Sequence, residues 1–144
     1  MRYPLNLQHS PDIVITCVDS KMARASIFSD LKHKAPNAYW FDLGNGHDYG
    51  QVIVGEFEKN RLNKRRLPHV VDLYPKIIEG PDDNEPSCSV PDALHKQDLF
   101  INHNLTVWSS QLLWTMFRKG ELKFHGCFVN QTDMTVAPLP IKTK

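Results

Sequence analysis

The first hydrophobic positions of the chain form a short unbroken run, Asp12–Val18, which is rich in β-branched residues. Such a run is typical of a strand that is buried on both faces in the middle of a parallel sheet. The segment from Ser20 to Ala35 then has apolar residues at helical spacing, and Pro36 stops it. We therefore predict a buried parallel strand, with Asp19 at its carboxyl end, followed by a helix.

Two more apolar stretches, Ala38–Leu43 and Gln51–Phe57, predict a second and a third strand. The glycines of the intervening segment, Gly44–Gly50, predict a tight turn with positive φ angles. From there to Pro91 the pattern predicts a long irregular stretch. Long loops in compact domains are usually functional or disordered.

The pattern from Gln97 to Lys119 predicts one long helix that ends at Gly120. Apolar residues recur along it in two stripes. A helix that is apolar on two sides is buried on two sides, either within the fold or at a subunit contact. The first stripe contains Ile101, Leu105, Trp108, Leu112 and Met116, and the second contains Val107, Trp114 and Phe117.

Beyond this helix, the segments 122–130 and 134–141 predict a hairpin that turns at Gln131–Asp133. The order of elements is strand, helix, two strands, long loop, helix and hairpin. This order indicates an α/β domain that changes from parallel to antiparallel pairing along its length. A length of 144 residues suits one such domain.

Charge and hydropathy exclude some classes of partner. A net charge of +1 gives no general electrostatic attraction to nucleic acid or to an anionic membrane. No apolar run approaches the roughly 20 residues that a membrane-spanning helix needs. We therefore expect no nucleic acid and no membrane as partners. The basic segment Lys59–His69 is either a solvated loop or a contact for phosphate or an acidic partner.

The three cysteines form no CxxC pair, which argues against a disulfide framework or a four-cysteine zinc site and favours a reducing cytoplasm. Cys17 and Cys127 fall in predicted strands and are expected to be core or sheet residues. Cys88 lies between Pro86 and Pro91, which predicts an exposed and rigid loop.

Three roles are open for Cys88, namely a small core residue, a metal ligand and a nucleophile. A helix beginning at Pro91 would lower its thiol pKa through the positive end of the helix dipole. The acidic residues just upstream would raise that pKa if they lie close; these are Asp82, Asp83 and Glu85.

Asp19 is the other candidate site residue. Open α/β sheets place their ligand crevice at the carboxyl ends of parallel strands, which is where Asp19 is predicted to lie. A carboxylate there can hold Mg²⁺ against a nucleotide phosphate. The alternative is that Asp19 only caps the following helix.

Four segments, taken in order, resemble the C-terminal half of the ThiF-type adenylyltransferases, which include MoeB and the ubiquitin-activating enzymes. The likeness is greatest to the ThiF-family proteins of the bacterial PRTRC system, a gene set of plasmids and mobile elements. The segments are PDIVITCVDS, YWFDLGNGHDYGQVIVG, PSCSVPDALHKQDLFIN and FVNQTDMTVAPLPI.

The resemblance implies that residues 1–144 are the C-terminal part of a single ThiF-like domain with a Rossmann-like mixed sheet and flanking helices. It also implies that the parent protein uses Mg-ATP to activate the C-terminal carboxylate of a small β-grasp protein. We expect a homodimer on a different ground, because a sheet that lacks its first strands leaves an open edge and uncovered apolar side chains. Asp19 matches the family aspartate that helps to hold Mg-ATP. Cys88 matches the cysteine that takes the modifier as a thioester, with Ser89 in place of threonine.

The sequence departs from the family pattern in two respects. The family's glycine-rich phosphate loop belongs upstream of Asp12 and is not present here, so we expect this chain alone to bind neither ATP nor magnesium and to be inactive. The paired CxxC motifs of many relatives are missing too, so we expect no structural zinc. The alternative function is a non-catalytic binding or assembly module of a plasmid-associated system.

We predict that Cys88 is the most reactive of the three thiols, because its proline-bounded segment indicates exposure while Cys17 and Cys127 fall in strand patterns. Brief alkylation of the native chain followed by mass spectrometry measures this order. Labelling of Cys17 or Cys127 before Cys88 would contradict the exposed-loop interpretation.

Overall fold

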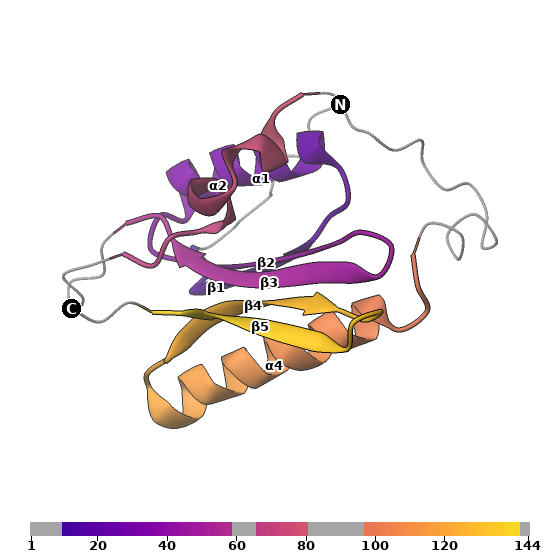
Figure 1. The fold of residues 1–144 in the computed structure, drawn as a ribbon. Coiled ribbons are helices and arrows are strands. Elements are labelled where there is room, and N and C mark those ends of the chain that lie inside the picture. The colour runs from indigo at the N-terminus through magenta and orange to yellow at the C-terminus, as the bar shows by residue number, and fades with distance from the viewer. Residues whose placement is uncertain (1–9, 59–65, 81–96, 142–144) are drawn as a thin grey trace. The chain divides into compact units, whose positions relative to one another are not determined.

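The computed structural model of the chain describes residues 10–58, 66–80 and 97–141 (Figure 1). They form an α/β fold in which five strands make one mixed sheet in the order β1-β2-β3-β4-β5, so the predicted class is confirmed. The elements are β1 (Ile13–Cys17), α1 (Lys21–Lys34), β2 (Tyr39–Asn45), β3 (Tyr49–Glu56), α2 (Val70–Leu73), the 3-10 helix η1 (Pro75–Ile78), α4 (Ile101–Lys119), β4 (Phe124–Asn130) and β5 (Thr135–Pro140).

The contacts of the chain separate two compact units. Unit 1 comprises residues 1–42 and 54–84, and unit 2 comprises residues 43–53 and 85–144. The boundary between the units crosses β2 and β3. Each unit is described below by itself.

The prediction of a strand buried in the middle of the sheet is wrong for β1. The strand forms and Asp19 follows its carboxyl end, but among the described strands β1 lies at the edge of the sheet with β2 as its one neighbour. Ile15 is 49% exposed, and Thr16 is the one buried residue of the strand. An apolar run reports the hydrophobicity of a strand and not how many neighbours cover it, so the sequence could not settle this point.

Helix α1 confirms the predicted helix of unit 1. The Ser20 hydroxyl accepts a hydrogen bond from the backbone N–H of Ala23 at 3.1 Å and so caps the first turn. Ala35 ends the helix, and Ile27 and Leu31 are buried on its inner face. Met22, which belongs to the same apolar pattern, is exposed.

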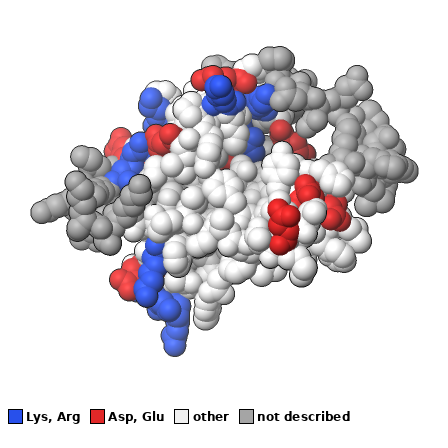
Figure 2. All heavy atoms as spheres, viewed as in Figure 1, with Lys and Arg blue, Asp and Glu red and all other residues white. Residues whose placement is uncertain are grey.

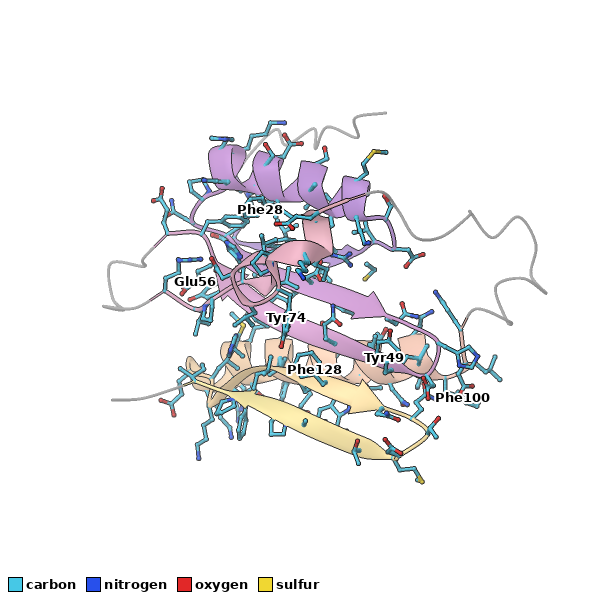
Figure 3. All side chains as sticks on the ribbon, turned by 45° about the horizontal axis from the view of Figure 1, so that its top comes forward. Phe28, Tyr49, Glu56, Tyr74, Phe100 and Phe128 are labelled. Atoms are coloured by element: carbon cyan, nitrogen blue, oxygen red, sulfur yellow. The ribbon has the colours of Figure 1, made fainter. Side chains whose placement is uncertain are left out.

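An aromatic cluster joins the elements of unit 1. Phe28 on α1 lies below that helix in Figure 3, with its ring centroid 6.3 Å from the Trp40 ring and 5.7 Å from the Phe57 ring. The His69 ring meets Phe57 at 4.9 Å. Because His69 comes from the segment that was predicted to be irregular, this packing fixes part of that segment against the core.

The prediction of a long irregular stretch is wrong for residues 70–78, which form α2 and η1. His69 and Asp72 form a capping box in which the Asp72 N–H donates to His69 Nδ1 at 3.1 Å and the His69 N–H donates to the Asp72 carboxylate at 2.8 Å. Arg66 pairs with the same carboxylate at 2.6 Å. Residues 59–65 of the basic segment and residues 81–96 fall outside the described residues.

Unit 2 is built on antiparallel strands. Strand β4 pairs with β3 and with β5, and residues 131–134 turn the β4–β5 hairpin as predicted. The turn between β2 and β3 is also tight, since the Gly46 N–H donates to the Tyr49 carbonyl at 2.8 Å. The positive φ angles predicted for this turn are wrong, because Gly80 and Gly120 are the described glycines with positive φ.

Helix α4 confirms the long helix, although it begins at Ile101 and not at Gln97, and Gly120 ends it with a φ of +68°. Its buried positions are Ile101, Leu105 and Ser109, so Ser109 and not Trp108 completes the inner stripe. The described chain leaves the second stripe of α4 open to solvent, so burial of this stripe within the fold is wrong, and its burial at a subunit contact stays a prediction. Trp114 is 63% and Phe117 is 71% exposed.

No helix in the described ranges combines the length and the apolar character that crossing a membrane requires.

Candidate functional site

Asp19 lies where the sequence placed it, directly between β1 and α1, and its side chain is exposed. It does not provide the side-chain cap of α1, because Ser20 does so. The alternative role of Asp19, as the cap of α1, is therefore wrong. Cys88, the other predicted site residue, lies outside the described residues, so the structure does not bring the two together.

A buried polar cluster, which sequence reasoning missed, holds the segment before Asp19. Arg24 of α1 donates from Nε to Asp42 Oδ1 of β2 at 3.0 Å and from Nη2 to the Val18 carbonyl at 2.6 Å. The Thr16 hydroxyl also lies 3.0 Å from Asp42 Oδ1. These bonds tie the carboxyl end of β1 to both α1 and β2. A single aspartate inside the apolar run of the predicted second strand is the signal that could have found this cluster.

The Asp42 carboxylate is not fully satisfied. Its Oδ2 atom is buried and has no hydrogen-bond partner among the described residues. Burial raises the pKa of Asp42, and the Arg24 guanidinium and the Thr16 hydroxyl oppose that rise through charge and hydrogen bonds. The cluster therefore has a structural role, although one oxygen of its buried carboxylate has no partner. Arg24 fixes the backbone just before Asp19 through its hydrogen bond to the Val18 carbonyl.

The described thiols are poor nucleophiles. Cys17 is the last residue of β1 and is exposed, so it is a sheet residue, as one of the two expectations had it, and not a core residue. Partial burial of its thiol and the carboxylates of Asp42 and Asp19 raise its pKa. Cys127 is buried in β4 as expected, and burial raises its pKa to about 11. Both thiols therefore stay protonated near neutral pH, and the thiolate is the reactive form.

His69 has a structural role as well. Burial lowers its pKa, which keeps the imidazole neutral and leaves Nδ1 able to accept the Asp72 N–H. Burial raises the pKa of Asp72, but the hydrogen bonds from Arg66 and from the His69 backbone outweigh that effect and the net shift is downward. In the part of the chain that the structure describes, no three His, Cys, Asp or Glu side chains are grouped so that they could hold a metal ion.

Unit 2 contains an apolar groove of about 620 Å³ between α4 and the β4–β5 hairpin. We call this site the hairpin groove. Its apolar walls include Trp108, Leu112, Phe124, Cys127, Val136 and Pro138.

Strand register explains which residues form the floor of the hairpin groove. Cys127 lies opposite Pro138, and Val129 lies opposite Val136, so these side chains share one face of the hairpin. Ala137, one position along, faces the other side. Val136 is 41% exposed because the described chain covers this part of β5 incompletely.

The helix wall opens along its length. The first half of α4 is buried at Ile101, Leu105 and Ser109, whereas Leu112 in its second half is only half-buried and Trp108 is 38% exposed. Gly50 allows the close approach of the first half, because a Cβ atom there would lie 2.7 Å from Leu105 Cδ1. Leu112, Thr115 and Lys119 of the second half line the hairpin groove together with residues of β4 and β5.

Comparison with known proteins adds no assignment to these features. No protein-family model matches the chain, and none of the curated proteins matches it. Functional inference therefore depends on the hairpin groove of unit 2 and the polar cluster of unit 1.

We predict that Asp42→Ala lowers the free energy of unfolding by about 3–5 kcal/mol, because it leaves the buried Arg24 guanidinium without its carboxylate. Urea denaturation measures the loss. Asp30→Ala is the matched control, because it breaks a partly exposed i,i+4 pair with Lys34 on α1 and should cost about 1 kcal/mol or less. Equal losses for the two variants would contradict the locking role of Asp42.

Ionisation of Asp42 makes the free energy of unfolding depend on pH, and the direction of the change follows from its pKa. Folding raises the Asp42 pKa above its ordinary value of 3.8, so the folded chain binds this proton more tightly than the unfolded chain. Protonation of Asp42 therefore stabilises the folded chain. This stabilisation is fully present below pH 3.8 and is lost as the pH rises through the folded-state pKa of Asp42. Asp42→Asn, which cannot ionise, should flatten that part of the stability profile.

Proposed function

We propose that this chain is a binding module and that the hairpin groove is its ligand site. The observation that carries the proposal is a groove of about 620 Å³ with mainly apolar walls. Small-molecule sites typically enclose about 300–1,000 Å³ and combine apolar walls with a few polar groups. The ligand is therefore a molecule whose surface is mostly apolar.

The walls of the hairpin groove favour binding over covalent chemistry. Cys127 is the nucleophilic side chain of the floor, and its raised pKa of about 11 keeps it a protonated thiol that packs like a small apolar group. Gln111 and Thr115 satisfy each other through a 3.2 Å hydrogen bond. Trp108 offers a large flat surface for contact, as is usual in ligand sites.

A second proposal keeps the adenylating function that the sequence resemblance implies, with Mg-ATP, a β-grasp protein substrate, a homodimer and a cytoplasmic location. It is supported by the strand–helix–strand unit β1–α1–β2 and by Asp19 at the carboxyl end of β1. The described residues supply Asp19 as one exposed carboxylate, and they contain no group of three or more His, Cys, Asp or Glu side chains that could hold a metal ion. The Rossmann-like ThiF architecture belongs to this second proposal.

Binding in the hairpin groove can be tested with Nile red, a neutral apolar dye whose fluorescence rises in apolar surroundings. We expect the chain to bind the dye and Val136→Asp to weaken binding at least five-fold, because it places a charge on the apolar floor. Fluorescence titration gives both dissociation constants.

Ala137→Asp is the matched control for Nile red binding, since it adds the same charge one residue along on the opposite face of β5. This variant should bind as the unchanged chain does. If Val136→Asp and Ala137→Asp bind the dye equally well, the hairpin groove is not the site.

The second proposal is tested by substrate-dependent ATP–pyrophosphate exchange. We expect none from the purified chain, because its sequence has no G-x-G-x-x-G turn to hold the phosphates. Robust exchange that Asp19→Ala abolishes would overturn this expectation and would favour the adenylating function over the binding module.

A further inference from the structure

The charges around the hairpin groove are gathered at one end of it. Lys119, Glu121 and Lys123 line the end where α4 passes into β4, and no other side chain of the lining is charged. Two ammonium groups therefore face a single carboxylate at this end. In Figure 2, basic side chains gather at the lower left, where α4 ends in Figure 1, and uncharged atoms cover the surface beside them.

The opposite end of unit 2 is acidic. The Asp98 N–H donates to the His47 carbonyl at 2.7 Å, and the Gln131 N–H donates to the Asp48 carbonyl at 2.8 Å, so the two strand turns and the start of α4 meet there. Figure 3 shows Tyr49 and Phe100 at this same end. Asp48, Asp98 and Asp133 carry its negative charge. Unit 2 is thus polarised along α4, from an acidic start to a basic end.

Stabilisation of the helix end explains why some, but not all, of these basic residues are found there. Cations in the last turn of a helix offset the negative end of its dipole, and Arg118 and Lys119 both serve that purpose. Lys123 lies beyond the helix, after Gly120, and has no such role. Within the described chain no ion pair joins the side chain of Lys119 or Lys123 to an acidic group.

The apolar part of the hairpin groove is elongated. Trp108 and Lys119 line it at two points of α4 that are eleven residues apart, or about 16 Å at a rise of about 1.5 Å per residue. A ligand that reaches from the basic end to Trp108 is therefore long and charged at one end.

We infer that the hairpin groove binds a single-chain amphiphilic anion of the medium-chain fatty-acid type, with its carboxylate at Lys119 and Lys123 and its alkyl chain toward Trp108. The inference rests on the proposed function and names the ligand class of the same site. A cationic amphiphile meets repulsion at the basic end, and a neutral one leaves the lysines unused.

The inference is tested by titrating the chain with octanoate, decanoate and dodecanoate below their micelle concentrations, with decanol and decyltrimethylammonium as controls. Binding should tighten about four-fold per methylene until the apolar part is full. Decanoate should bind more tightly than decanol, and decyltrimethylammonium should bind most weakly. Salt should weaken decanoate binding and leave decanol binding unchanged.

Two variants locate the carboxylate. The double variant Lys119→Gln with Lys123→Gln should weaken decanoate binding about five- to ten-fold, the effect of losing two solvent-exposed ion pairs, and leave decanol binding unchanged. Arg118→Gln is the matched control, because it removes a charge from the last turn of α4 without touching the lining of the hairpin groove, and decanoate binding should be retained.

The outcomes separate this inference from the proposed function. Equal binding of decanol and decanoate, with no effect of the lysine variants, overturns the inference while Nile red binding upholds the binding module. Binding to anionic vesicles without binding of free decanoate also overturns it. If no alkanoate binds and light scattering shows a dimer that Val136→Asp dissociates, the occupant is a second copy of the chain and the inference is wrong.

Discussion

The close approach of Leu105 to Gly50 sets the position of α4 and, with it, the candidate site. A Cβ atom at position 50 would lie 2.7 Å from Leu105 Cδ1 and 2.8 Å from the Gly44 carbonyl oxygen, so glycine at this position favours the close packing of α4. The helix is held at its first half, at Ile101, Leu105 and Ser109. A helix fixed at one half over a hairpin leaves apolar side chains uncovered along the other half, and the hairpin groove is the result.

Unit 1 depends in a similar way on one buried pair. Arg24 and Asp42 bring α1, the end of β1 and the middle of β2 together, and the Arg24 bond to the Val18 carbonyl fixes the backbone just before Asp19. An ion pair of this kind is weak evidence for high stability, since desolvation offsets much of its attraction, but breaking it is costly. Burial raises the pKa of Asp42, so desolvation opposes the attraction between this carboxylate and Arg24. The exposed carboxylate of Asp19 is therefore held on a well-ordered segment, whether or not it has a ligand.

Apolar periodicity gave correct predictions where local forces dominate. The helix from Lys21 to Lys34 is capped by Ser20 and ends at Ala35, and α4 ends at Gly120 in a left-handed conformation, because caps and glycine act within one turn of the chain. The β4–β5 hairpin follows from two alternating strands separated by a short turn. Predictions failed where distant segments decide the outcome, as in the mid-sheet position of β1 and the irregular structure of residues 70–78. The capping box of His69 and Asp72 ordered the latter segment against the aromatic cluster.

The sequence by itself determined the α/β class, the order of most elements and the position of Asp19 after the first strand, because hydrophobic spacing and capping residues encode local conformation directly. It also named Cys88, which lies outside the described residues. Only the tertiary structure decided that Trp108 lines a groove while Ser109 is buried, that Cys127 forms part of its floor, and that Lys119 and Lys123 lie at one end of it. The physical reason is that a groove is a property of surfaces from two elements. Its walls come from α4 and from a hairpin whose register sets which side chains face the helix. The apolar spacing of the helix and the alternation of the strands do not specify how far apart these two elements lie.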